Sequence, residues 1–194
     1  MTDEKSRTLS DARSLRALSH PVRLALLEAL LTGPLTATQA GELIDESPTT
    51  CSFHLRQLAR YGFVEETGGG RGRARPWRLT HVGWSAPAQP DNPEFTRAVQ
   101  VLDHVLLDRQ VARIRRFVDA APTYSPQWQA AARGHTSILH LTAAETAELA
   151  AAYQEVTERF RTRWAGRTEQ PEGALPVETF YGVYPVDKPP REGS

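Results

Sequence analysis

Apolar residues recur every three or four positions between residues 15 and 31, the spacing of the buried face of an amphipathic helix. This run predicts two helices, because His20 stands before Pro21. The residue before a proline is disfavoured in a helix, whereas proline suits the first position of the next one. Gly33 ends the second helix, and Thr36 is placed to cap a short third helix.

A fourth helix is predicted between Ser47, which is suited to cap it, and Gly62, which ends it. Its inner face is the stripe Cys51, Leu55 and Leu58. Two short strands follow at residues 63–66 and 77–80, joined by a loop rich in glycine and arginine. Residues 11–80 are therefore expected to fold as four helices and a long-tipped hairpin.

A long fifth helix is predicted to begin after Asn92, where a cap, a first-turn proline and an acidic residue follow one another, and to reach about Ala120. It has two apolar faces. The first consists of Phe95, Ala98, Val99, Leu102, Val105 and Leu106. The second consists of Leu107, Val111, Ile114 and Val118. A helix with two such faces is expected to contact two different partners.

Residues 122–187 extend the chain beyond this helix. Ser125 is placed to cap a short helix, and a capping box that begins at Thr142 opens a sixth helix. The apolar stripe of that helix is Leu149, Ala152, Tyr153, Val156, Phe160 and Trp164. Alternating patterns predict strands at residues 137–141 and 177–186, which are expected to pair with each other.

The composition excludes several classes of protein. The chain has 194 residues, 40% of them apolar, which is enough for a globular core of one or two domains. There is no run of about 20 apolar residues, and the start lacks the apolar core of a secretory signal, so we expect a cytoplasmic protein without membrane contact. The single cysteine, Cys51, excludes an intramolecular disulfide, a thiolate zinc cluster and a Cys-x-x-Cys redox centre.

Charge is unevenly distributed, although Lys plus Arg and Asp plus Glu both total 23. Residues 47–80 hold six arginines against two glutamates, a local charge of +4. Helical geometry groups part of this charge with polar side chains on the outer face of the fourth helix. That face consists of Thr49, Phe53, Arg56 and Arg60, flanked by Thr50, His54 and Gln57. Hydroxyl, amide and guanidinium groups can donate to phosphates and base edges, as a helix in a DNA major groove requires.

The glycine- and arginine-rich loop at residues 67–76 lies directly downstream. Its glycines would let the backbone approach a phosphate ridge, and Arg71, Arg73 and Arg75 would neutralise phosphates or enter a minor groove. Alternatively, the outer face is only a solvated surface and the loop a mobile or RNA-binding segment. A dinucleotide-binding loop is excluded, because Pro76 and a strand follow the glycines instead of a helix.

At this point the sequence resembles the ArsR-type winged-helix repressors. The matching segments are Leu18-Ser-His-Pro-Val-Arg23, Ser52-Phe-His-Leu55 with Leu58, and Gly62-Phe-Val64, and the likeness covers roughly residues 13–82. The resemblance implies a homodimer that sits on inverted-repeat operator DNA and blocks transcription until an effector or a modification releases it. It also implies that Ser52 and His54 lie near the DNA backbone.

The resemblance further implies that Thr49, Phe53 and Arg56 face bases. Phe53 is unusual where the family often has a polar residue, so it either presses on a thymine methyl group or packs against the third helix. The residues expected to contact DNA are Ser47, Thr49, Thr50, Ser52, Phe53, His54, Arg56, Gln57, Arg60, Arg71, Arg73 and Arg75. Those expected at the dimer interface are Phe95, Val99, Leu102 and Leu106.

Metal sensing is the best-known chemistry of that family, and here the sequence departs from it. The Cys-x-Cys pair typical of the third helix is absent at residues 39–44. His104 and Asp108, four apart on the fifth helix, make half a zinc site at most, so we expect no metal and no cofactor. Cys51 is expected to serve packing rather than a redox switch, because it falls on the inner stripe.

These elements predict a mainly α fold with a small amount of β. The expected parts are a winged helix-turn-helix domain at residues 11–83, a long dimerisation helix at 92–121, a small α/β extension at 122–187 and a disordered tail at 188–194.

The extension would either line an effector pocket with its aromatic residues or only complete the core. The residues considered for such a pocket are Trp128, Tyr153, Phe160, Trp164, Phe180, Tyr181 and Tyr184. No catalytic set is recognisable, so an enzyme is not expected. The predicted partners are double-stranded DNA, a second copy of the chain and an unidentified small-molecule effector. The alternative function is a small-molecule sensor or a protein-interaction module that uses the extension.

Overall fold

The structure is a computed structural model that describes residues 7–68, 75–165 and 171–187. The chain forms two compact units, Met1–Ala131 and Ala132–Ser194. The predicted disordered tail at 188–194 lies outside the described residues.

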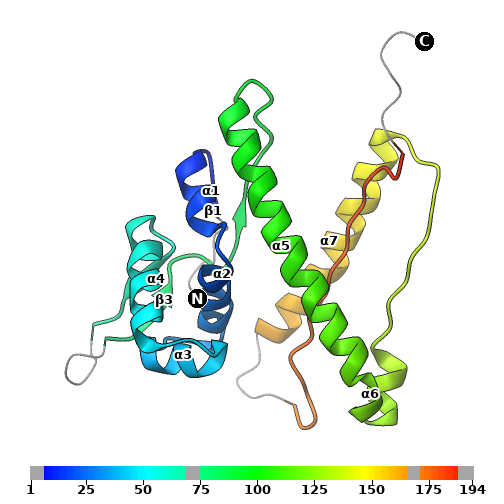
Figure 1. Cartoon of the computed structure of the whole chain (residues 1–194). Helices are drawn as coiled ribbons and strands as arrows, with labels where there is room; N and C mark the ends of the chain where they lie inside the picture. Colours follow the sequence, from blue (N-terminus) through cyan, green and yellow to red (C-terminus); the bar gives the residue numbers. More distant parts are fainter. Residues whose placement is uncertain (1–6, 69–74, 166–170, 188–194) are drawn as a thin grey trace. The chain divides into compact units, whose positions relative to one another are not determined.

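The four predicted N-terminal helices are confirmed (Figure 1). They are α1 (Ala12–Leu18), α2 (Pro21–Ala29), α3 (Ala37–Ile44) and α4 (Pro48–Arg60). Side chains cap each helix start, because the first N–H groups of a helix have no partner within it. Asp11, for example, accepts from the backbone N–H of Ser14 at 2.8 Å, and hydrogen bonding from Ser14 lowers the pKa of its carboxyl below the ordinary value. Thr36 and Gln39 form a complete capping box at α3.

The turn between α3 and α4 brings the two helices close together. Asp45 ends α3 in the left-handed conformation, with φ of 57°, which lets the chain reverse within a few residues. Gly41 is buried on α3 beneath this turn, and a Cβ atom there would lie 2.5 Å from the backbone oxygen of Glu46. The helix-turn-helix geometry therefore depends on the absence of a side chain at Gly41.

The hairpin is confirmed as the antiparallel pair β2 (Val64–Glu66) and β3 (Trp77–Leu79). Trp77 also exchanges two backbone hydrogen bonds with Leu35, so the chain before α3 adds a third, minimal strand to the hairpin. A second, parallel pair joins β1 (Arg7–Thr8) to β4 (Trp84–Ser85). Neither strand is predicted from the sequence, because a strand of two residues has no readable alternation.

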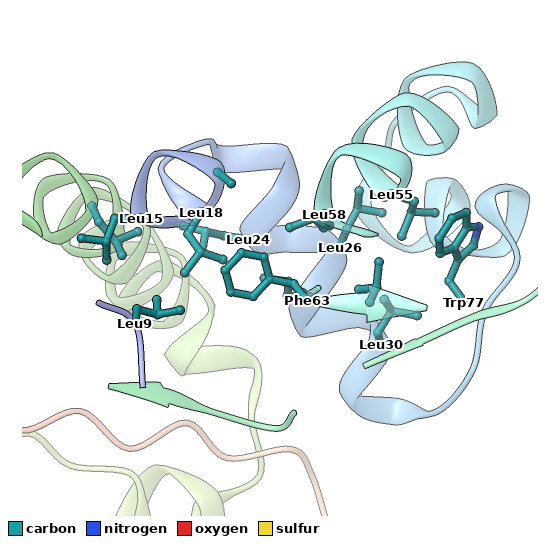
Figure 2. Close-up of a cluster of buried hydrophobic side chains, with 14 of the residues drawn as sticks. Leu9, Leu15, Leu18, Leu24, Leu26, Leu30, Leu55, Leu58, Phe63 and Trp77 are labelled. Carbon is teal, nitrogen blue, oxygen red and sulfur yellow. The ribbon is translucent and has the colours of Figure 1, made fainter. Parts of the chain in front are cut away.

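One hydrophobic core holds these elements together. Figure 2 shows side chains from α1, α2, α4 and the hairpin meeting in it. Its fully buried large side chains include Leu15, Leu18, Leu24, Leu26, Leu55 and Leu58. The inner stripe predicted for the fourth helix is thus confirmed, because Cys51 is buried there as well.

The long helix α5 (Pro93–Ala120) is confirmed, and its first apolar face packs on α1 of the same chain. Phe95 and Leu102 are buried in the core, and Val99 and Leu106 pack against it. Phe95 and Leu102 are therefore covered within the chain rather than by a second copy, which corrects the expectation for these two residues. Val99 and Leu106 are half-buried, and their place at a dimer interface stays a prediction. Helical periodicity identifies an apolar face but not the surface that covers it, and α1 covers this one.

The other side of α5 is left exposed along its length. Four exposed large apolar residues share it: Leu107, Val111, Ile114 and Val118. Val101 and Phe117 are exposed as well, but they lie at other angles around the helix. A 3-10 turn, η2 (Ala121–Thr123), and the short helix α6 (Pro126–Ala131) follow, so the predicted short helix is confirmed. A similar turn, η1 (Leu30–Thr32), extends α2.

The second unit contains the predicted helix α7 (Ala143–Ala165), which begins with the expected capping box. The strands predicted at residues 137–141 and 177–186 are wrong, since neither segment is a strand. A strand needs a hydrogen-bonded neighbour, which alternation in the sequence cannot supply. The tertiary contacts include a stack of the Tyr153 and Tyr181 rings, 5.4 Å between centroids. Among the residues described for this unit, none is buried.

The mainly α fold with a winged domain and a long helix is confirmed. No helix in the described part of the chain combines the length and apolar character needed to span a bilayer.

Candidate nucleic-acid interface

Helix α4 is held at its start by its own side chains. The Ser47 hydroxyl accepts from the backbone N–H of Thr50 at 3.0 Å and lies 2.9 Å from the Thr50 hydroxyl. Pro48 occupies the first helical turn, where its missing N–H is not needed. Ser47 and Thr50 therefore cap the helix. If their hydroxyl groups contact DNA, the cap has already fixed the positions of these groups.

The inner face of α4 anchors the helix in the core. Cys51, Leu55 and Leu58 are fully buried. Burial, and then the nearby charge of Glu46, raise the pKa of the Cys51 thiol, which keeps it protonated near neutral pH. A thiol that is buried and protonated is a poor nucleophile, so packing rather than a redox switch describes this residue.

The outer face of α4 is open to solvent, with the composition expected from the sequence. Thr49, Phe53, Arg56 and Arg60 are exposed, whereas Thr50, Ser52 and Gln57 are half-buried at its edges. The Phe53 side chain is 52% exposed. The face therefore offers a hydroxyl group, two guanidinium groups and one aromatic ring, with a half-buried amide beside them.

His54 does not belong to this exposed face, although it was expected among the DNA-contacting residues. It is only 8% exposed, and its ring centroid lies 4.4 Å from that of His20, the N-cap residue of α2. Burial, followed by the charges of His20 and Arg23, lowers the pKa of His54 below its ordinary value. The buried ring packs α4 against α2, which corrects the expectation that His54 is presented to a DNA backbone.

Sequence reasoning missed the pairing of His20 with His54. His20 was visible only as the residue before a helix start, where its Nδ1 does accept from the backbone N–H of Val22 at 3.2 Å. Burial, then the charge of Arg23, lowers the pKa of His20, with Glu46 opposing. No local signal links two histidines that come together only when α2 and α4 pack.

The hairpin next to α4 carries the remaining charge. Arg75 pairs with Glu66 at 3.1 Å, and Arg78 pairs with Glu65 at 2.6 Å. The two arginine side chains are mostly exposed, and the two glutamate side chains are a little under half exposed. Part of the local positive charge is thus offset by the two glutamates. Arg71 and Arg73, also predicted to contact DNA, lie outside the described residues.

The described residues hold no evident metal site. They contain no group of three or more histidine, cysteine, aspartate and glutamate side chains able to hold an ion. A hollow of about 380 Å³ lies at the turn between α3 and α4. It is lined by Thr38, Gly41, Glu42, Asp45, Glu46, Ser47 and Pro48. None of the aromatic residues considered for an effector pocket is among them.

Comparison with models of protein families matches residues 18–67 to a helix-turn-helix domain. Comparison with curated proteins finds no match. Among solved structures, the chain is similar to the homodimeric winged helix-turn-helix DNA-binding domain of Mb0332 from Mycobacterium bovis, a possible ArsR-family transcriptional regulator. The identity is 24% over 53% of this chain and 77% of that one, with a TM-score of 0.33.

Two further structures show a likeness of the same order. A possible transcriptional regulator for arsenical resistance is 26% identical over 52% of this chain and 94% of that one, with a TM-score of 0.32. ZitR from Lactococcus lactis, solved in complex with DNA, is 12% identical over 82% of both chains, with a TM-score of 0.29. Because these TM-scores are low, the family match over residues 18–67 is the finding that identifies the domain.

Proposed function

We propose that this chain, in which a winged helix-turn-helix domain spans α1 to the hairpin, is a DNA-binding transcriptional regulator of the ArsR type. In this proposal it acts as a dimeric repressor on inverted-repeat operator DNA. The observation that carries the proposal is the outer face of α4. Thr49, Arg56 and Arg60 are exposed together there, while the opposite face of the same helix is fixed in the core.

This arrangement suits insertion of α4 into a major groove. The groove admits one α-helix, and the second helix of a helix-turn-helix reads base edges with its N-terminal residues. Arg56 has the fork of donors that fits guanine, and Gln57 has the amide that fits adenine. The polar groups are already positioned by helix caps and packing, so binding need not order them.

The hairpin and the loop at its tip supply the sequence-independent contacts. Arg71, Arg73 and Arg75 would meet phosphates or the minor groove beside the helix. Arg75 must then leave Glu66 or share it, which costs little because the pair is exposed.

The proposal includes a dimer. Its surface differs from the face of α5 that was expected from the sequence, because that face packs on α1. The exposed apolar side of α5, including Leu107, Val111 and Ile114, is the surface offered to a second copy. A two-fold dimer would present two copies of α4 to half-sites about one DNA turn, or a multiple of it, apart.

A second candidate function belongs to the second unit. Large apolar side chains such as Phe160, Trp164 and Tyr184 are exposed there, which favours a protein-interaction role for the extension. A small-molecule sensor would instead be supported by a ligand that raises the melting temperature of the full chain.

Selection of genomic fragments by the purified full chain tests the main proposal. We expect enrichment of an inverted repeat, and an affinity that falls steeply with salt as counterions are released from DNA. Neutralising Arg71, Arg73 and Arg75 to glutamine should lower the affinity for all duplex DNA, whereas Arg97→Gln, an exposed change on α5, should not. Absence of enrichment together with a flat salt response would defeat the proposal. If the variant with glutamine at all three positions still binds a protein partner, the protein-interaction role is supported instead.

A further inference from the structure

The aromatic ring of Phe53 stands out on the proposed DNA-reading face. The other exposed side chains of that face, Thr49, Arg56 and Arg60, end in hydrogen-bonding groups, whereas phenylalanine has none. More than half of the Phe53 side chain is exposed, so it is not a core residue packed beneath α3. An apolar ring held open to water is stabilised when a partner covers it.

The ring is supported from below. It meets the His54 ring edge-on, with 5.1 Å between centroids and an interplanar angle of 76°. His54 is buried and its ring in turn contacts, at a tilt of 39°, the ring of His20, which caps α2. A continuous set of three aromatic rings thus runs from the capped start of α2 to the surface of α4, and it restricts the directions in which Phe53 can point.

The position along the helix fits a reading role. Phe53 is in the N-terminal half of α4, the part of a recognition helix that reaches base edges. Arg56 follows one turn later, about 4.5 Å further along the helix axis. Because successive base pairs are about 3.4 Å apart, the two side chains would address neighbouring base pairs.

The chemistry of the groove then selects the base. The edges of the base pairs in the major groove present hydrogen-bond donors and acceptors, and the apolar group that distinguishes one of the four bases is the C5-methyl of thymine. We propose that Phe53 is a specificity-determining residue that reads a thymine methyl group, next to the base pair read by Arg56. This inference rests on the proposed DNA-binding function, and it specifies thymine as one base that the protein recognises.

A uracil scan of the selected operator tests the inference without altering the protein. Replacing thymine by uracil removes only the methyl group. We expect about a fourfold loss of affinity, the effect of losing burial of one methyl-sized group, at one position in each half-site. Cytosine placed at that position should gain a similar factor when it carries a 5-methyl group.

Variants assign the effect to the residue. Phe53→Ala should bind the thymine and uracil operators equally, and Phe53→Leu should keep part of the difference because it keeps apolar contact. Arg56→Ala should lose its own base preference but still respond to uracil, which makes it the matched control.

The outcomes separate this inference from the function on which it rests. Failure of the unchanged protein to prefer any DNA sequence would remove the proposed function. Sequence-preferring binding with equal affinity for uracil at every position would overturn the Phe53 inference alone. A uracil response that persists unchanged in Phe53→Ala would overturn it as well.

Discussion

The Glu28 carboxylate on α2 lies 2.5 Å from the guanidinium group of Arg109 on α5, 81 residues later in the chain. Arg113, one turn further along α5, reaches the other oxygen of the same carboxylate at 2.8 Å. Arg109 also donates to the backbone oxygen of Pro21 at 3.1 Å. The long helix is therefore fixed to the helix-turn-helix domain by ion pairs with α2 as well as by its apolar contact with α1.

Changing Glu28 to glutamine removes the charge that both arginines share. We expect a loss of roughly 1 kcal/mol in the free energy of unfolding, because the three side chains are partly exposed and solvent screens the pairs. Urea titrations of the unchanged chain, Glu28→Gln, Arg109→Gln and the double variant give the coupling free energy between the two side chains. Strictly additive losses would contradict a direct interaction between Glu28 and Arg109.

Gly41→Ala should loosen the helix-turn-helix itself. The added Cβ would lie 2.5 Å from the backbone oxygen of Glu46 and 3.5 Å from Cys51 Sγ, and a backbone atom cannot easily move away. We expect a destabilisation of about 1–3 kcal/mol, typical of overpacking. Gly134→Ala is the matched control, because no atom lies within 4 Å of its would-be Cβ. Equal melting temperatures for the two variants would show that α3 and α4 are not closely packed at Gly41.

The buried His54 and the half-buried His20 predict an acid-sensitive domain. Burial, and then the charge of Arg23, lowers the pKa of His20 from 6.5. Burial, and then the charges of His20 and Arg23, lowers the pKa of His54 from 6.5, and Glu46 opposes the shift at both histidines. The unfolded chain therefore binds more protons than the native one between the lowered pKa values and 6.5. The free energy of unfolding should fall as the pH drops through about 6.5, and it should level off once the native pKa values are passed.

Denaturant titrations between about pH 5 and pH 7.5 measure this dependence. His54→Gln should flatten the curve, whereas the exposed His140→Gln should leave it unchanged. A protein equally stable throughout this range would contradict the lowered pKa values of His20 and His54.

The exposed side of α5 predicts how the chain associates. Ile114→Ser combined with Val118→Ser should shift the proposed dimer toward monomer with little loss of monomer stability, because both side chains are exposed in one chain. Sedimentation at micromolar concentration reports the change, and Val82→Ser, an exposed apolar site outside α5, is the control. An unchanged protein that sediments as a monomer would reject this dimer.

Local signals in the sequence account for most of the helical elements. Caps such as Thr36 and Ser47, and helix starts at prolines, depend on neighbours within four residues, so they are readable without tertiary structure. The strands predicted at 137–141 and 177–186 failed for the opposite reason. Alternation indicates that a segment could be a strand, but pairing depends on a partner that the pattern does not name.

The candidate site shows the same limit. Periodicity placed Thr49, Phe53 and Arg56 on one face, and the structure exposes all three. Periodicity could not reveal that His54 turns inward to contact His20, nor that α1 rather than a second chain covers Phe95 and Leu102. Both are contacts between segments at least 34 residues apart, and helical spacing carries no information about them.

One ratio tests the central claim most directly: the affinity for the selected operator divided by the affinity for a scrambled duplex of the same length. It is measured for the unchanged chain, Arg56→Ala and Arg97→Ala. If α4 reads bases, Arg56→Ala should lower this ratio by about 10-fold or more, as expected for loss of one bidentate base contact. Arg97→Ala, the same change on α5, should leave the ratio intact. An equal ratio for all three proteins, or a loss that affects both duplexes alike in Arg56→Ala, would contradict the placement of α4 in the major groove.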